Sequence, residues 1–80
     1  MGLLEHLTNL LGCQYLSDLP MAAITPKQAD QILSLSEEQF TVQDFREAAQ
    51  YITRSKEDFL TAALAKEAIV RHLLENASRE

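Results

Sequence analysis

The sequence predicts an all-α domain, and three observations carry that prediction. Gly and Pro number only two each, so the chain has few of the turns that sheets require. Apolar residues recur at helical spacing in four stretches, and most of these stretches begin with a helix-capping pattern. We therefore expect one domain, residues 1–80, built as a small bundle of four main helices with one or two short extra turns. The helices are predicted at about 3–11, 26–34, 42–53 and 56–77.

The first helix is predicted from a stripe of leucines that share one helical face. Gly12 follows as a natural stop, because glycine adopts the left-handed conformation without a steric penalty. Residues 13–21 have room for one short helical turn before the second helix. The leucines of the stripe are Leu3, Leu4, Leu7, Leu10 and Leu11.

The second and third helices have the clearest start signals in the chain. Thr25 and Gln28 form a capping box around Pro26, which suits the first helical position. Thr41 is the next cap, and Phe40 and Phe45 occupy the two positions of a hydrophobic staple. Between these helices, residues 36–39 offer another capping pattern, which predicts either a single turn or a capped loop.

The last helix is predicted to begin after Ser55, which can cap it. A start at Lys56 leaves a very short link to the third helix, so we expect the two to be neighbours, either antiparallel or sharply bent. The predicted length, about 33 Å at 1.5 Å per residue, is large for so small a domain. Glu67 and Arg71, four residues apart, are expected to form a surface pair.

The apolar face predicted for this last helix spans about 200°, twice the width that a surface helix needs. Either the helix is central and the others wrap it, which is the more common arrangement, or part of the face is left for another chain. Lys66 interrupts the face. We expect its amine to extend to water. The more specific alternative is that the amine forms an ion pair with a carboxylate across a helix-helix or subunit interface.

Acidic residues outnumber basic ones, and the excess lies in the first half of the chain. There are 12 acidic and 7 basic residues, a formal net charge of −5. Residues 46–80 are balanced, whereas residues 1–45 hold Lys27 as their only base. This charge repels phosphate backbones, so we expect no nucleic-acid partner. The acids of the first half are Glu5, Asp18, Asp30, Glu37, Glu38 and Asp44.

No segment of the sequence predicts membrane insertion or export. No apolar run approaches the roughly 20 residues needed to span a bilayer, and no basic region precedes an apolar run at the N-terminus. Cys13 is the only cysteine, so the chain has no internal disulfide. A cytoplasmic location and no membrane partner are the expectations.

The sequence offers no constellation of residues typical of an enzyme. The histidines are far apart, and no glycine follows Gly12 to build a phosphate loop. Spacing alone leaves a pair of Cys13 and His72 open, since catalytic partners meet in space. We interpret Cys13 as a small buried apolar residue and His72 as a solvated one. No catalytic residue, cofactor or metal site is predicted.

The surplus apolar surface favours a noncatalytic protein-protein interaction module, either binding a protein partner or forming a homodimer through the C-terminal helix. One alternative is a helix-turn-helix-like DNA-binding regulator built from the helices at 26–34 and 42–53, although the exposed side of the latter is only weakly basic. Another is a small acidic inhibitor that presents Glu37, Glu38 and Asp44 to a basic site on a larger protein. The predicted interface residues are Leu60, Leu64, Lys66, Ile69, Leu73, Leu3 and Leu7.

Overall fold

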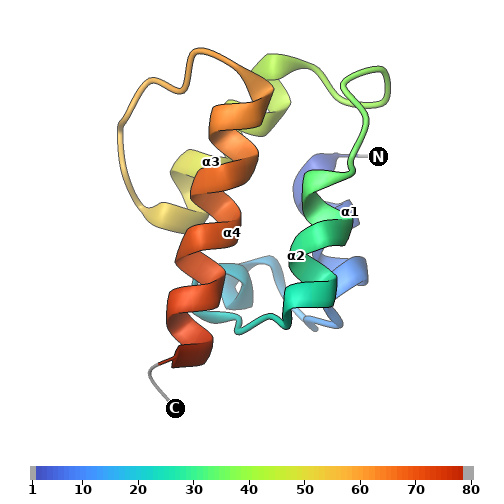
Figure 1. Cartoon of the computed structure of the whole chain (residues 1–80), viewed down its shortest axis with the longest axis vertical. Helices are drawn as coiled ribbons and strands as arrows, with labels where there is room; N and C mark the ends of the chain where they lie inside the picture. The colour runs from blue at the N-terminus through green and yellow to red at the C-terminus, as the bar shows by residue number, and fades with distance from the viewer. Residues whose placement is uncertain (1, 79–80) are drawn as a thin grey trace.

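The computed structural model describes residues 2–78, and they form an all-helical, compact arrangement, which confirms the predicted fold class. Its elements are α1 (Leu3–Leu11), the short 3-10 helix η1 (Leu16–Met21), α2 (Pro26–Leu33), α3 (Val42–Thr53) and α4 (Ala62–Ser78) (Figure 1). Helix η1 is the extra turn expected before the second helix. None of the helices within residues 2–78 combines the length and apolar character that crossing a bilayer requires.

The predicted helix ends of α1, α2 and α3 are confirmed in atomic detail. Gly12 closes α1 in the left-handed conformation, at φ 70°. Thr25 and Gln28 form the capping box of α2. At the start of α3, the Thr41 hydroxyl accepts from the amide of Asp44 at 3.1 Å, and the Asp44 carboxylate accepts from the amide of Thr41 at 3.1 Å.

The hydrophobic staple at α3 is also present, since the Phe40 and Phe45 rings meet edge to face at 6.1 Å. Phe45 is fully buried, so the staple fixes the start of α3 to the core. Ahead of it, residues 37–39 form a turn in which the Ser36 hydroxyl accepts from the amide of Glu38. This pattern caps a loop and does not start a helix.

Helix α4 begins at Ala62, six residues after the predicted start at Lys56. The Ser55 hydroxyl does accept from the amide of Glu57, but that bond closes only a local turn in the loop. The cap of α4 is Thr61, whose hydroxyl accepts from the amide of Leu64 at 3.1 Å. The helix is therefore about 26 Å long at 1.5 Å per residue, and not 33 Å.

Side chains of α3 hold the loop before α4 in its non-helical path. Gln50 donates its amide to the carbonyl of Glu57 at 3.0 Å, and Arg46 donates its Nε to the carbonyl of Phe59 at 3.1 Å. Arg46 also pairs with the Asp58 carboxylate at 3.2 Å. These bonds occupy carbonyls that a helix would have used internally, while the Phe59 side chain enters the core.

The same bonds set the direction of α4. The loop runs back along α3, because its residues meet first Gln50 and then Arg46, nearer the start of that helix. Helices α3 and α4 are neighbours, as predicted, but both run toward the bottom of Figure 1. The expected antiparallel or sharply bent pair was wrong, because the link is longer than the sequence pattern suggested.

One continuous cluster of apolar side chains forms the core. Helix α4 packs against α3, α2 and η1, while α1 packs against α2, α3 and η1. Within the described residues, helix α4 makes no such contact with α1, so it is not a central helix that all the others wrap, and its most extensive contact is with α3. The largest fully buried side chains are Phe45, Leu7, Leu19, Ile32, Ile52, Ile69 and Leu73.

Candidate functional site

The residues predicted to form an interface divide between the core and the surface. Leu3, Leu7, Ile69 and Leu73 are buried in the core of the single chain. Leu60 and Leu64 are exposed, at 72% and 48% of their full accessible surface. In α4, the buried side is a stripe of Ala62, Ala65, Ile69, Val70 and Leu73, so the exposed Leu64 lies on the other side of this helix.

Lys66 is half-buried and bound to backbone carbonyls at the end of α2. Its Nζ donates to the carbonyl of Leu33 at 3.3 Å and to that of Leu35 at 3.0 Å. The same ammonium lies 5.4 Å from the centre of the Phe45 ring. The suggested ion pair with a carboxylate is absent from residues 2–78. Lys66 instead caps the C-terminal end of α2, where a positive charge complements the helix dipole.

The exposed side of α4 carries a seam of residues spaced alternately by four and three positions. We call this seam the outer face of α4; it consists of Leu64, Glu67, Arg71 and Leu74 on the helix and of Leu60, which lies in the loop just before the helix begins. Alternating spacing of this kind keeps side chains on one line of a helix and is the pattern that paired helices use. Leu74 is half-buried, whereas the residues before it in the seam are exposed.

Two hollows flank the outer face, and both include Glu67 and Arg71 in their walls. One, of about 340 Å³, lies near the start of α4 and is bounded by Phe59, Leu60 and Leu64. The other, of about 370 Å³, lies between α2 and α4 and is lined by Leu33, Val70 and Leu74. The second hollow is the more apolar of the two.

The two charged residues at the middle of the outer face are not paired with each other. Among residues 2–78 the ion pair present is that of Arg46 with Asp58, so the expected surface pair of Glu67 and Arg71 does not form. Arg71 and Glu67 are both exposed. Their charges thus remain free to meet opposite charges from outside the chain.

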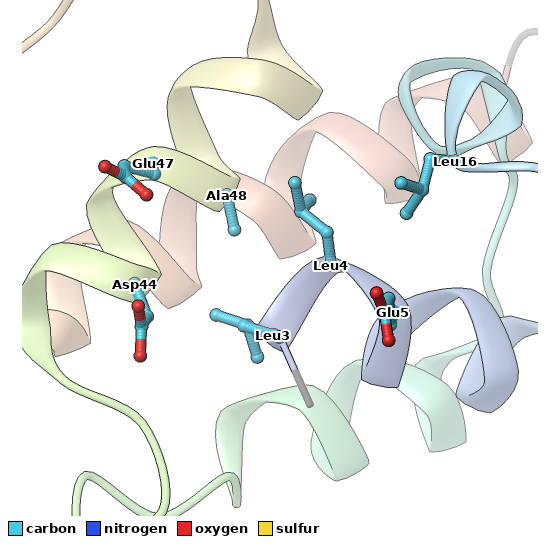
Figure 2. A pocket seen from close by; sticks show the side chains of 8 residues that line it. Leu3, Leu4, Glu5, Leu16, Asp44, Glu47 and Ala48 are labelled. Carbon is cyan, nitrogen blue, oxygen red and sulfur yellow. The ribbon is translucent and has the colours of Figure 1, made fainter.

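A third hollow, of about 250 Å³, lies where the start of α1 meets α3 and η1 (Figure 2). Its apolar lining comes from Leu3, Leu4, Leu16 and Ala48. Carboxylates lie at its rim on two sides: Asp44 and Glu47 belong to α3, and Glu5 belongs to α1. Sequence reasoning missed this site because its residues come from three separate elements.

The acids singled out for an inhibitory role do not gather in one place. Asp44 lines the third hollow, whereas Glu37 and Glu38 lie in the exposed turn before α3 and do not line it. Helices α2 and α3, the pair considered for DNA binding, make no close backbone contact within the described chain. A helix-turn-helix requires a short turn between packed helices, so this arrangement gives that alternative no support.

His72 and Cys13, the two residues considered as a catalytic pair, have environments that do not favour catalysis. His72 is half-buried, and not solvated as expected, because its Nε2 lies 2.8 Å from the carbonyl of Pro20. Burial, with a smaller contribution from the Asp18 carboxylate, raises the pKa of the half-buried Cys13 thiol. A raised pKa lowers the thiolate fraction, which is the opposite of an activated nucleophile. Within residues 2–78, potential metal ligands do not gather in groups of three or more.

Comparison of the chain with known protein families, curated proteins and solved structures finds no match.

Proposed function

We propose that this protein is a noncatalytic interaction module that pairs with a second copy of itself through the outer face of α4. The observation that supports the proposal is the seam itself. Leu64, Leu74 and the oppositely charged residues Glu67 and Arg71, which form no ion pair within the described chain, share one line along the helix, and the exposed Leu60 precedes it in the loop. Contiguous exposed apolar surface of this kind, bordered by polar residues, is typical of a protein-protein contact.

The order of residues along the seam suits an antiparallel pair related by a two-fold axis. With the axis level with residue 69, Glu67 of each copy lies opposite Arg71 of the other. Leu64 then lies opposite Leu74. A two-fold contact forms each of these pairings twice, so each charge meets its opposite, and Leu64 and Leu74 meet each other. A parallel pair would instead place like charges level with each other.

The hollow between α2 and α4 supports the same arrangement. Its lining of Leu33, Val70 and Leu74 is next to the position that Leu64 of the second copy would take. Inserting a side chain from one helix into a depression on another is the packing mode of paired helices. The contact is small, so we expect a dissociation constant on the order of micromolar or weaker.

Sedimentation velocity over a series of protein concentrations tests this proposal. The wild-type chain should shift from one to two copies as concentration rises. Leu64→Asp should remain monomeric, because it places a charge at an apolar contact that forms twice. Met21→Asp is the matched control, since Met21 is 78% exposed and lies on η1, away from α4's outer face.

A wild-type chain that stays monomeric at every concentration would contradict the proposal. Equal association by the Leu64→Asp and Met21→Asp chains would contradict it as well, because the contact would then lie elsewhere. Circular dichroism of both variants verifies that each keeps its helices.

A reducing compartment such as the cytoplasm suits this module, because its single thiol would otherwise be open to intermolecular oxidation.

A further inference from the structure

The hollow between α1, η1 and α3 combines an apolar floor with an acidic edge. Leu3 is buried there, Leu4 is half-buried, and Leu16 is 41% exposed, so part of the apolar lining remains accessible. An enclosed apolar cavity of about 150 Å³ is large enough to bind benzene. The hollow's volume of about 250 Å³ therefore accommodates at least one large apolar side chain.

The charge at the edge of this hollow is of one sign. Among residues 2–78, none of those that line it is basic, whereas Glu5, Asp44 and Glu47 are acidic. Asp44 and Glu47 each commit one oxygen to a bond within α3 or its cap, with Thr41 and Gln43 respectively. The second oxygen of each carboxylate has no hydrogen-bond partner in the described chain. The nearest basic residue in sequence, Arg46, is engaged by Asp58 and the Phe59 carbonyl.

We infer that this hollow binds a basic amphipathic helix of a partner protein, with an apolar side chain on the floor and Lys or Arg at the edge. An amphipathic helix presents apolar and charged residues at neighbouring positions, which matches an apolar floor bordered by carboxylates. The acidic surplus of residues 1–45 extends the attraction beyond the hollow and favours encounter with a basic partner. The inference is independent of pairing through α4, because the two surfaces share no residues.

The probe is a short fluorescent helical peptide made of Leu and Lys, with a peptide of the same pattern made of Leu and Glu as its counterpart. Anisotropy is measured with the wild-type chain and with the Leu64→Asp chain, so that self-association through α4 cannot be mistaken for peptide binding. We expect the Leu/Lys peptide to bind both chains, more weakly as salt is raised, and the Leu/Glu peptide to bind neither.

Variants locate the binding on the chain. Glu5→Gln combined with Glu47→Gln should weaken binding about three- to tenfold, the range expected for two exposed charge pairs. Leu16→Ala should weaken it further by removing part of the apolar lining. The matched control is Glu57→Gln combined with Glu75→Gln, which removes the same charge at residues that do not line the hollow. Asp44 is left intact because it caps α3.

Four results would overturn the inference. One is equal binding of the Leu/Lys peptide by the two double variants, and another is equal binding of the two peptides. The third is a nuclear magnetic resonance titration in which the largest shifts fall on the outer face of α4. If the Glu5→Gln/Glu47→Gln change alters the oligomeric state of the Leu64→Asp chain, the hollow binds a second copy, and the peptide assignment is wrong.

Discussion

At the scale of single residues, Lys66 joins three parts of the molecule. From its position on α4, its ammonium reaches the carbonyls of Leu33 and Leu35 at the C-terminal end of α2, and the face of the Phe45 ring. Hydrogen bonds that involve a charged group are worth about 1.5–3 kcal/mol, and a cation over an aromatic ring adds roughly 0.5–1 kcal/mol. Lys66 therefore stabilises the contact between α2 and α4 without a carboxylate partner.

Replacing Lys66 with Met should lower the free energy of unfolding by about 1–3 kcal/mol, because the two carbonyls lose their donor while the apolar stem is kept. Urea unfolding followed by circular dichroism measures the change. Lys27→Met is the control, since Lys27 is exposed on α2. Loss of stability no greater than that of the control would show that the bonds of Lys66 contribute nothing.

The pH dependence of the reactivity of Cys13 tests the environment that the structure gives its thiol. Burial and the Asp18 carboxylate both disfavour its thiolate, so they raise its pKa. The rate of alkylation by iodoacetamide follows the thiolate fraction, and its inflection should lie at higher pH in the folded chain than in the chain unfolded by urea. Asp18→Asn should move the inflection part of the way down. An inflection at the same pH in the folded and unfolded chains would contradict the assigned environment.

At the scale of elements, helix ends differ in how far they can be predicted from sequence. The boxes at Thr25 and Thr41 and the stop at Gly12 depend on residues within a few positions of each other, so the sequence predicts them correctly. The start of α4 depends on Arg46 and Gln50, which reach the loop from another helix. A local capping signal at Ser55 cannot reveal that competition.

This difference predicts unequal effects for two similar substitutions. Thr61→Ala should cost about 1 kcal/mol of stability, the usual value for removing a helix cap. Ser55→Ala should cost a few tenths of a kcal/mol, because Ser55 bonds only within a loop turn. Urea unfolding of the two variants compares them. A larger cost for Ser55→Ala would indicate that α4 begins near residue 56 after all.

The later start also explains why the exposed face of α4 was only partly predicted. With a helix from residue 56, Phe59 and Ala63 fall at the centre of the apolar face. In the structure Phe59 belongs to the loop, and Ala63 is exposed. The buried stripe is therefore narrower than expected and consists of Ala62, Ala65, Ile69, Val70 and Leu73. Leu60 and Leu64 lie outside this buried stripe and are exposed, as the interface hypothesis requires. Ile69 and Leu73, which were also predicted to form the interface, are buried in it.

At the scale of the whole molecule, composition and apolar spacing suffice to predict the fold class, because helix content and core size follow from local patterns. The third hollow and the carbonyl contacts of Lys66, His72 and Asn76 could not be predicted in this way. Asn76, for example, donates to the carbonyls of Pro20 and Ala22 at 3.0 and 2.9 Å. Such contacts join residues 31 to 56 positions apart, so no local signal marks them.

The central claim at this scale is that two copies meet through the outer face of α4 in antiparallel orientation. Glu67→Arg makes both charged positions of the seam basic, and Arg71→Glu makes both acidic. Each variant alone should therefore be monomeric, because like charges face each other twice across the two-fold axis. In an equimolar mixture, each basic position meets an acidic one, and a mixed dimer should form.

Sedimentation velocity of the two variants, separately and mixed, tests the claim most directly. We predict that each separate variant sediments as one copy and that the mixture sediments with twice the chain mass, as the wild-type chain does at the same concentration. A mixture that remains monomeric while the wild-type chain dimerises, or separate variants that dimerise as well as the wild-type chain, would contradict the pairing of Glu67 with Arg71 and with it the proposed contact.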